Sequence, residues 1–495
     1  MGDWEQLDAR LAEIADLRRA SYLLEWDMEV MMPPGGAATR SRSIATLEGM
    51  IHERIAHPDL GKIIGELEAT APTDIEKAAT LRLLRREYNK ATKVPAGLVK
   101  ELAEVTSNAY HAWHEGKEAA DFAMFQPHLE RIVELKKQYA DALGWETERY
   151  DAMFDEYEPG MKASEVEVIF DELVAGLADV IDPVIQAAGS KPDWLKGDFD
   201  DTKRVGFCDW LAQHVGFDVA NGRLDTSPHP FNIQVGPGDV RQTVQRKGGS
   251  IVDAVFTTLH ETGHALYDQG LPEGDGPVAD TPSIGIHESQ SRLWENHVGR
   301  SRPFCEFVLP HLQERFPELG TLTPEEFYKG ATHPERSLIR VEADELTYPF
   351  HIIVRFELEL ALFRDQLAVA DLPGAWDAAY EKHLGIRPSD HAEGVLQDMH
   401  WSIGYFGYFP PYTLGTLYAA AFFAKANADL GGLDDDLRKG DCSRLLEWLR
   451  TNIHSKGHLR SSTDLARDVL GDGLSAKPFL EHVRSRYGEL YDLNI

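Results

Sequence analysis

Helical periodicity extends through most of the 495 residues, and this feature limits most strongly how the chain can fold. Apolar positions recur every three or four residues between stops made of proline and glycine, as in "MMPPGGA". Ser164 with Glu167, and Thr323 with Glu326, fit the capping box that opens a helix. No repeat, low-complexity linker or charge block marks a boundary, so the sequence predicts one large, mainly α-helical domain.

One stretch, residues 229 to 246, departs from the helical pattern. In "HPFNIQVGPGDVRQTVQR", Phe231, Ile233 and Val235 alternate with polar residues, and the even spacing resumes in two valines after a Gly-Pro-Gly-Asp turn. This pattern predicts a small β hairpin.

The charge balance limits the partners. The chain has 82 acidic and 50 basic residues, a formal net charge of −32. Such a chain repels the phosphate backbones of nucleic acids and disfavours anionic membrane surfaces. We therefore expect neither nucleic acid nor membrane as a partner.

Three cysteines, Cys208, Cys305 and Cys442, lie far apart and lack metal-ligand spacing. An odd number of scattered cysteines is typical of packed thiols in a reducing compartment. The N-terminus lacks the apolar stretch of a secretory signal, and no apolar run reaches the length of a membrane span. The sequence thus predicts a soluble, cytoplasmic protein.

The segment "SIVDAVFTTLHETGHALYDQGLP", residues 250 to 272, contains an HExxH motif. In a helix, His260 and His264 share one face, and both can bind one metal ion. Glu261 is rotated by about 100° from His260, so it can reach a water on that ion and act as a general base.

The motif alone is weak, since it should occur by chance roughly 0.1 times in a chain of this length. A buried helix whose histidines bond to neighbours is the alternative. The context favours a metal: the helix is apolar on nearly every side, and residues 248 to 291 contain seven acids but no lysine or arginine.

A catalytic zinc needs a third protein ligand. The pattern with a third histidine six residues after the second is absent, because Gly270 stands there. Downstream, "SIGIHESQSRLWENHVG" offers Glu288 and Glu295 on one helical face, so that one can bind the metal and the other support it. We favour Glu288 as the ligand; the alternative is an ion pair with Arg292.

Three further stretches join charged and apolar residues. Arg241 and Arg340 can each form a planar fork for a carboxylate, although an internal ion pair of Arg340 with Glu342 or Asp344 is the simpler interpretation. His400, in "QDMHW", is by default a core histidine held by a neighbour such as Asp398. Tyrosines after it can donate to an oxyanion.

At these positions the chain resembles the Taq-type metallocarboxypeptidases, a family of HExxH zinc carboxypeptidases, nearly from end to end. The motifs shared with the family stand in order as "HPF" at 229–231, "DVRQT" at 239–243, "HETGH" at 260–264, "HESQ" at 287–290, "IRVEAD" at 339–344 and "GVLQDMHW" at 394–401. The opening "WDMEVMMPPGGA" also resembles the family's sequences, as does "DEYEPGM" at 155–161.

The resemblance implies a role for each matching residue. The metal ligands would be His260, His264 and Glu288, and the catalytic acid/base would be Glu261. The residues that contact the substrate would be Arg241, Arg340, His229 and His400. A weaker resemblance to helical zinc oligopeptidases, which place tyrosines five and twelve residues after a histidine, adds Tyr405 and Tyr412, of which we expect Tyr412 to stabilise the oxyanion.

The family fold implied is almost wholly helical, with a deep groove and a small sheet beside the metal, usually as a homodimer. We expect one domain over residues 1–495, with helices to about residue 160 covering the groove and a catalytic core from about 200 to 430. One ion per chain is expected, Zn²⁺ with Co²⁺ as the alternative.

The sequence therefore predicts a zinc carboxypeptidase that releases C-terminal residues from peptides with a free carboxylate. An oligopeptidase that cuts internally in short peptides is the nearest alternative, and the two arginines argue against it. A non-catalytic helical peptide-binding scaffold is the alternative from another class. Two features argue against it: the general base Glu261 is present, and the metal has no fourth protein ligand, as a structural zinc site would.

Overall fold

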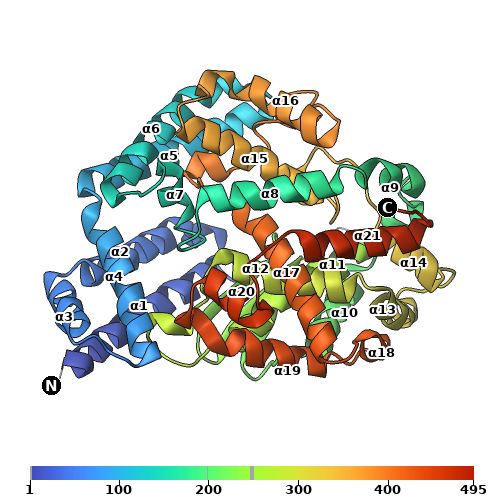
Figure 1. The fold of residues 1–495 in the computed structure, drawn as a ribbon, viewed down its shortest axis with the longest axis horizontal. Helices are drawn as coiled ribbons and strands as arrows, with labels where there is room; N and C mark the ends of the chain where they lie inside the picture. Colours follow the sequence, from blue (N-terminus) through green and yellow to red (C-terminus); the bar gives the residue numbers. More distant parts are fainter. Residues whose placement is uncertain (1–2, 198, 246–249) are drawn as a thin grey trace.

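The computed structural model describes residues 3–197, 199–245 and 250–495, which form 21 α-helices and three β-strands (Figure 1). The mainly α-helical fold predicted from periodicity is therefore confirmed. The helices before the sheet are α1 (Asp3–Val30), α2 (Ala37–Ile55), α3 (Pro58–Ala69), α4 (Ile75–Lys93), α5 (Ala96–Glu118), α6 (Gln126–Leu143), α7 (Arg149–Phe154), α8 (Ala163–Leu177), α9 (Ile181–Ala188) and α10 (Asp201–His214).

The helices after the sheet carry most of the predicted site. They are α11 (Ile251–Asp268), α12 (Ile284–Arg292), α13 (Arg302–Arg315), α14 (Pro324–Ala331), α15 (Tyr348–Phe363), α16 (Leu372–Leu384), α17 (Pro410–Asp429), α18 (Asp434–Arg438), α19 (Ser443–Asn452), α20 (Ser462–Leu470) and α21 (Lys477–Tyr491). A π-helical turn, Leu293–Gly299, extends α12. Among the described residues, no helix is long and apolar enough to cross a membrane.

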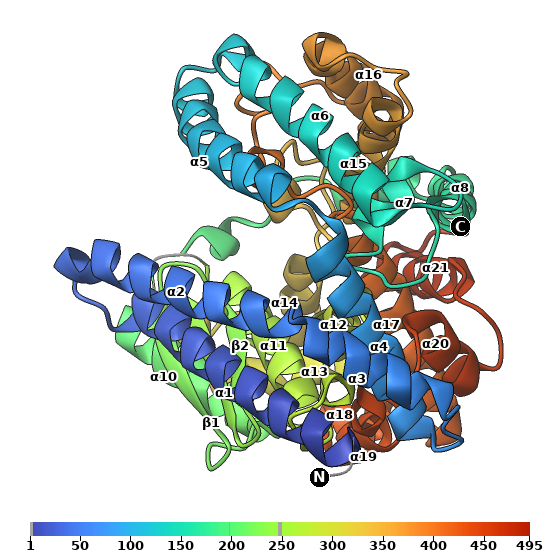
Figure 2. The same ribbon diagram turned by 90° about the vertical axis from the view of Figure 1, so that its left-hand side faces the viewer.

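The helices form an upper and a lower group. Figure 2 shows α5, α6 and α16 above, α1, α2 and α10 below, and α4 rising between them. One main apolar core extends from Ala109 to Leu490, whereas α1 to α4 bury two smaller clusters of their own, centred on residues such as Ile64 and Ile51. A third small cluster joins Leu83 of α4 to Val278, in the 3-10 turn Pro277–Ala279. The N-terminal helices therefore add a separate layer to the main core.

A three-stranded sheet lies beside α11. Strands β1 (Gly222–Ser227), β2 (Asn232–Gly236) and β3 (Asp239–Gln245) are ordered β1-β3-β2, with β2 antiparallel and β1 parallel to β3. The predicted hairpin is confirmed as β2 and β3, and Arg246 lies outside the described residues. Strand β1 was not predicted, because "GRLDTS" shows no apolar alternation.

The two predicted capping boxes have different outcomes. Thr323 caps α14, and its backbone N–H donates to the Glu326 carboxylate at 2.9 Å, as predicted. The prediction at Ser164 is wrong, since α8 already begins at Ala163. Its first N–H groups are satisfied earlier, by Asp151 at Ala163 (2.9 Å) and by Glu165 at Lys162 (2.8 Å).

Candidate metal centre and active site

Helix α11 carries the HExxH motif through the interior. Ser250 caps it by accepting the Asp253 backbone N–H at 3.0 Å. Thirteen of its 18 residues are buried, so the helix has core on nearly every side. The His260 and His264 rings stand 5.0 Å apart on the same face, as expected for side chains four residues apart.

Two glycines bring α12 close to its neighbours. A Cβ on Gly263, inside HETGH, would lie 2.6 Å from the Gln290 carbonyl oxygen and 2.7 Å from Ser291 Cα. On the other side of α12, a Cβ on Gly415 of α17 would lie 2.7 Å from Glu288 Cβ. Helix α12 thus lies between α11 and α17, with its backbone against Gly263 and the Glu288 side chain against Gly415, where neither glycine position has room for a side chain, and this packing sets where Glu288 points.

Glu288 completes a three-residue group with the two histidines. Its Oε2 lies 3.4 Å from His264 Nε2 and 3.7 Å from His260 Nε2, and the three ligand atoms lie within 4.8 Å of one another. The other oxygen, Oε1, accepts the Arg292 Nε–H at 2.7 Å. The ion pair weighed as the alternative therefore exists, yet it leaves the second oxygen facing the histidines. Burial opposes ionisation, but Arg292 and His260 hold the pKa of Glu288 well below its usual range.

Glu295 supports the first histidine from behind. Its Oε2 lies 2.9 Å from His260 Nδ1, so that the Nε2 of the same ring faces Glu288. Glu295 belongs to the π-helical turn, and its other oxygen accepts a hydrogen bond from Arg300 at 2.6 Å. A carboxylate on the far nitrogen fixes the tautomer and orientation of a metal-binding imidazole.

The second histidine is held by a stacked ring. His264 lies 4.4 Å from the parallel ring of His287, whose Nε2 is 3.0 Å from Asp268 Oδ1. Asn232 of β2 donates to the other oxygen of Asp268 at 2.6 Å, which ties the sheet to this side of the site. Burial, and then His287, lower the pKa of His264 to about 4, so the imidazole is neutral, the form that binds a metal.

Glu261 lies next to this group and has an altered acidity. It is 8% exposed, and burial raises its pKa to about 7. A carboxyl group with a pKa near neutrality can both accept and return a proton at ordinary pH. The position and the pKa both suit a general acid/base.

Two arginines share one carboxylate near the metal group. Arg340 donates to Asp398 Oδ1 from Nε (3.1 Å) and Nη2 (2.9 Å), and Arg355 donates to Oδ2 at 2.7 Å. The prediction that Arg340 pairs with Glu342 or Asp344 is therefore wrong. Arg355 is fully buried and was not predicted. Its place within the apolar run "FHIIVRFELEL" could have indicated a buried cation.

Aromatic side chains connect Arg340 with the metal group. Arg340 Nη1 donates to the Tyr348 hydroxyl at 3.2 Å, and the Tyr348 ring lies 4.5 Å from the Arg292 guanidinium, the partner of Glu288. Tyr412 lies 5.4 Å from the Arg340 guanidinium. Arg340 and Tyr412 therefore belong to the same site as the histidines, and Tyr348 is a member that the sequence did not reveal.

The loop before α17 brings further tyrosines. Tyr408, which was not predicted, shares a hydrogen bond with Tyr412, and its ring lies 5.3 Å from the His400 ring. His400 is not held as expected: its Nδ1 is 3.9 Å from Asp398 and makes no hydrogen bond with the described residues. Tyr405 is 41% exposed. Tyr408 lies in the loop before Pro410, where α17 begins, so a helical spacing from Tyr412 could not have indicated it.

Arg241 and His229 lie apart from these residues. Arg241, on β3, pairs with Asp239 through two hydrogen bonds of 2.8 Å, and its guanidinium lies 4.4 Å from the Trp26 ring of α1. His229 is exposed in the turn after β1. Among the described residues, neither forms a hydrogen bond, ion pair or ring contact with His260, His264, Glu288 or Arg340.

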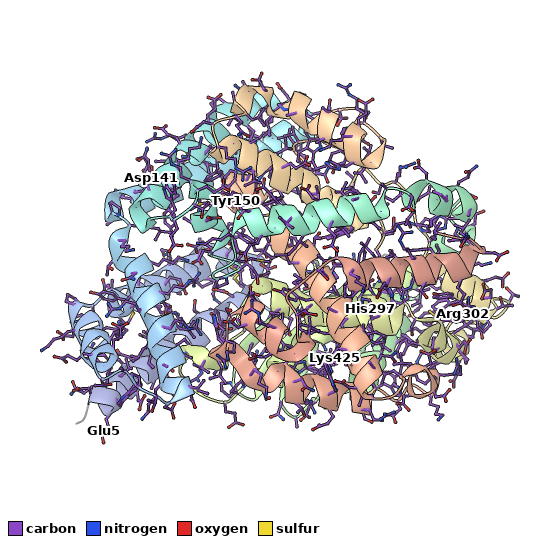
Figure 3. The ribbon with its side chains drawn as sticks, in the orientation of Figure 1. Glu5, Asp141, Tyr150, His297, Arg302 and Lys425 are labelled. Carbon is purple, nitrogen blue, oxygen red and sulfur yellow. The ribbon has the colours of Figure 1, made fainter. Side chains whose placement is uncertain are left out.

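A second group with ligand-type atoms is His297, Glu345 and His482 (His297 is labelled in Figure 3). His482 is 2.9 Å from one oxygen of Glu345, and the buried Arg486 donates to the other. Arg486 thus already neutralises Glu345, and a divalent cation would bring uncompensated charge into the core. We interpret this group as a structural ion-pair network.

Comparison with known proteins agrees with the site. Residues 6–487 match the family described as Carboxypeptidase Taq (M32) metallopeptidase. "Thermostable carboxypeptidase 1" of Thermus thermophilus is 41% identical, with 97% of each chain covered. "Thermostable carboxypeptidase 1" of Pyrococcus furiosus is 35% identical, with 98% of each chain covered.

A solved structure shows the same fold. The crystal structure of the M32 carboxypeptidase from Deinococcus radiodurans R1 superposes with a TM-score of 0.96 at 38% identity, covering 100% of both chains. The relatives are named carboxypeptidases, which supports an enzyme over a scaffold and release of end residues over internal cutting. The chain therefore belongs to the carboxypeptidase Taq (M32) family and is a metallocarboxypeptidase.

Proposed function

We propose that this metallocarboxypeptidase uses one Zn²⁺ per chain, with Co²⁺ as the alternative, to release the last residue of peptides that end in a free carboxylate. The observation that carries the proposal is the convergence of two histidine Nε2 atoms on Glu288 Oε2, next to Glu261. The proposed ligands are His260, His264 and Glu288.

The donor set fits such an ion. Two imidazole nitrogens and one carboxylate oxygen are ligands that zinc takes in catalytic sites, which keep one position open. Glu295 and Arg292 orient the ligands from behind, as metal sites require. When bound, the ion supplies a Lewis acid that polarises the scissile carbonyl and activates a water.

The side chains around the ion move the protons and hold the charge. Glu261 accepts a proton from the attacking water and passes it to the nitrogen of the leaving residue as the peptide bond breaks. The Tyr412 hydroxyl donates to the carbonyl oxygen as negative charge develops there. Burial raises the pKa of Tyr412, so this hydroxyl keeps its proton. His400 and Tyr405 line the site.

The arginines supply the selectivity for chain ends. Arg340 and Arg355 carry two positive charges against one on Asp398, so the group has a surplus of one positive charge in a chain of net charge −32. Arg355 is fully buried, and Arg340 retains N–H groups that are not used by Asp398 or Tyr348. We assign the substrate carboxylate to Arg340. For Arg241 and His229, the motif match is the only support.

The wider organisation is part of the proposal. The continuous main core supports one domain over 1–495, with N-terminal helices to about residue 160 that cover the groove and a catalytic core of about 200–430. The separate clusters among α1 to α4 support this division. A homodimer rests on the family resemblance. The three buried, free thiols support a reducing, cytoplasmic location.

The proposal is tested with a pentapeptide in two forms. The purified enzyme, with its metal content measured, is incubated with the free acid and with the C-terminal amide, and products are followed in time by mass spectrometry. We expect sequential loss of single residues from the free acid alone, abolished by a chelator and restored by Zn²⁺ or Co²⁺. Equal cleavage of the amide, or internal fragments as first products, would contradict the proposal.

A further inference from the structure

Glu359 on α15 is a fully buried carboxylate outside the site described above. In the described part of the chain it forms no ion pair, and Arg355, one turn earlier on the same helix, is paired with Asp398. Burying a carboxylate without a counter-ion costs free energy unless hydrogen bonds replace the lost water. The hydrogen-bond partners of Glu359 therefore show what this carboxylate holds in place.

Three donors occupy the two oxygens of Glu359. Oε1 accepts the Trp401 indole N–H at 2.7 Å. Oε2 accepts the Gly407 backbone N–H at 2.9 Å and the hydroxyl of Tyr150 on α7 at 2.8 Å (Tyr150 is labelled in Figure 3). An indole N–H and a backbone N–H can only donate, so both oxygens must accept. A glutamine, with one acceptor oxygen and one NH₂ group, would satisfy only one of these two N–H groups.

The two anchored residues, Trp401 and Gly407, enclose a segment of the candidate active site. Trp401 follows His400 in a 3-10 turn, and Gly407 directly precedes Tyr408. Gly407 has a φ of +82°, and a Cβ on it would lie 2.8 Å from the backbone of α7, so this position requires glycine. The buried carboxylate thus fixes both ends of the segment against α7 and α15.

Tyr408 connects the anchored segment with the proposed oxyanion donor. Its ring lies 5.3 Å from the His400 ring, at the start of the segment, and 5.5 Å from the Tyr412 ring. Tyr408 shares a hydrogen bond with Tyr412, and both hydroxyls lie within electrostatic reach of the proposed ligand Glu288. A shift of the segment at Tyr408 would therefore displace the Tyr412 hydroxyl from the metal group.

We propose that Glu359 is a positioning residue for peptide hydrolysis. It holds Tyr408, and through Tyr408 the Tyr412 hydroxyl, where negative charge develops on the scissile carbonyl oxygen. This inference rests on the oxyanion role proposed above for Tyr412. A misplaced donor costs more in the transition state than in the bound substrate, so its effect is on kcat and not on KM. Arg340, assigned to the substrate carboxylate, is held separately by Asp398.

The test compares two variants of the holoenzyme that each disturb the same buried carboxylate. Glu359→Gln releases one end of the segment, so kcat on the free-acid pentapeptide should fall by about 10–100-fold, with KM and metal content near the wild-type values. Tyr150→Phe removes only the third hydrogen bond; it should lower the melting temperature but keep kcat near the wild-type value. Equal losses of kcat in both variants, or a wild-type kcat in Glu359→Gln, would overturn the proposal.

Trp401→Phe tests one anchor without changing the carboxylate. It keeps an aromatic ring in the core, removes the N–H that Oε1 accepts, and takes the place of Glu359→Gln if that variant does not fold. We expect a fall in kcat here too, with KM near the wild-type value. A Trp401→Phe enzyme with the kcat of the wild type would refute the anchoring role.

A further pair of variants separates this inference from the proposed function. In a Tyr412→Phe background, Glu359→Gln should lower kcat much less than in the wild type, because the hydroxyl that it positions is already absent. A full effect in both backgrounds would refute action through Tyr412. A wild-type kcat in Tyr412→Phe alone would remove the oxyanion role and this inference with it. A loss of kcat in Tyr412→Phe but not in Glu359→Gln would refute the positioning role alone.

Discussion

Gly263 in the HExxH helix lies against the backbone of Ser291 so closely that a Cβ on Gly263 would stand 2.7 Å from Ser291 Cα. Real side chains do not approach that far, and the neighbouring atoms are backbone that cannot rotate away. The glycine between the two histidines therefore sets the distance between α11 and α12. The same distance sets how far Glu288 is from the histidines.

The first prediction follows from this contact. Gly263→Ala should push α12 away from α11, displace Glu288 and weaken metal binding by about tenfold, because overpacking a core contact costs about 1–3 kcal/mol. Metal affinity is measured by competition with a chromophoric chelator. The control is Gly206→Ala on α10, where a Cβ meets nothing within 4 Å. Unchanged affinity in Gly263→Ala would show that α12 does not depend on this contact.

The second prediction concerns the proposed acid/base. Glu261→Gln keeps the shape of the side chain but cannot take up a proton, so kcat should fall by about 10²–10⁴-fold. Metal content should stay near one ion per chain, since Glu261 is not a proposed ligand. Stopped-flow hydrolysis and metal analysis of the same preparation check both points. A variant with full activity would remove Glu261 from the mechanism.

The third prediction separates the two arginines. Arg340→Ala should raise KM for free-acid peptides by about 10–100-fold, the effect of one charged hydrogen bond of about 1.5–3 kcal/mol, and change kcat less. Arg241→Ala, which loses contacts with Asp239 and Trp26, should leave KM near the wild-type value. The reverse result would transfer the carboxylate site to Arg241.

The HExxH helix could be predicted because its determinants are local. The cap at Ser250, the apolar periodicity and the spacing of the two histidines all lie within one segment, and the structure reproduces the cap and the shared face. Glu288 also lies beside the histidines, where the sequence placed it. What holds it there could not be predicted, because the close approach at Gly263 and Gly415 joins segments that are distant in sequence.

The ion-pair partner of Arg340, by contrast, could not be predicted from nearby sequence. Glu342 and Asp344 are the nearest acids in sequence, yet the partner is Asp398, 58 residues away. Asp344 is engaged elsewhere, because it accepts the backbone N–H groups of Leu346 and Thr347 just before α15. Short sequence separation therefore misled the prediction: an acid beside a helix start finds backbone donors before it finds a side chain.

The fourth prediction concerns support of a ligand. Glu295→Gln removes the negative charge that holds His260 Nδ1 and should weaken metal affinity by about 10–100-fold, as loss of such outer partners does. Chelator competition measures it, with Glu325→Gln, which changes a partly exposed pair with Arg302, as the control. Equal affinity in both variants would mean that the π-helical turn does not orient His260.

The last prediction concerns Glu158, whose buried carboxyl group lies before α8 and contacts the start of α12. Glu158 is fully buried, accepts the Gly285 N–H at 3.2 Å, and has one oxygen without a hydrogen-bond partner in the described structure. Burial raises its pKa from 4.5 to about 7. An acid whose pKa rises on folding binds more protons in the folded state between these two values. The free energy of unfolding therefore falls as pH rises from about 4.5 to 7 and stays level above.

Glu158→Gln should remove this contribution, which amounts to about 3 kcal/mol. The melting temperature of the variant should decline less between pH 5 and pH 8 than that of the wild type, while Glu359, whose pKa is also raised to about 7 by burial, keeps its own contribution in both. Glu53→Gln, an exposed substitution on α2, should follow the wild-type curve. Parallel curves for Glu158→Gln and wild type would show that Glu158 is ionised in the folded protein.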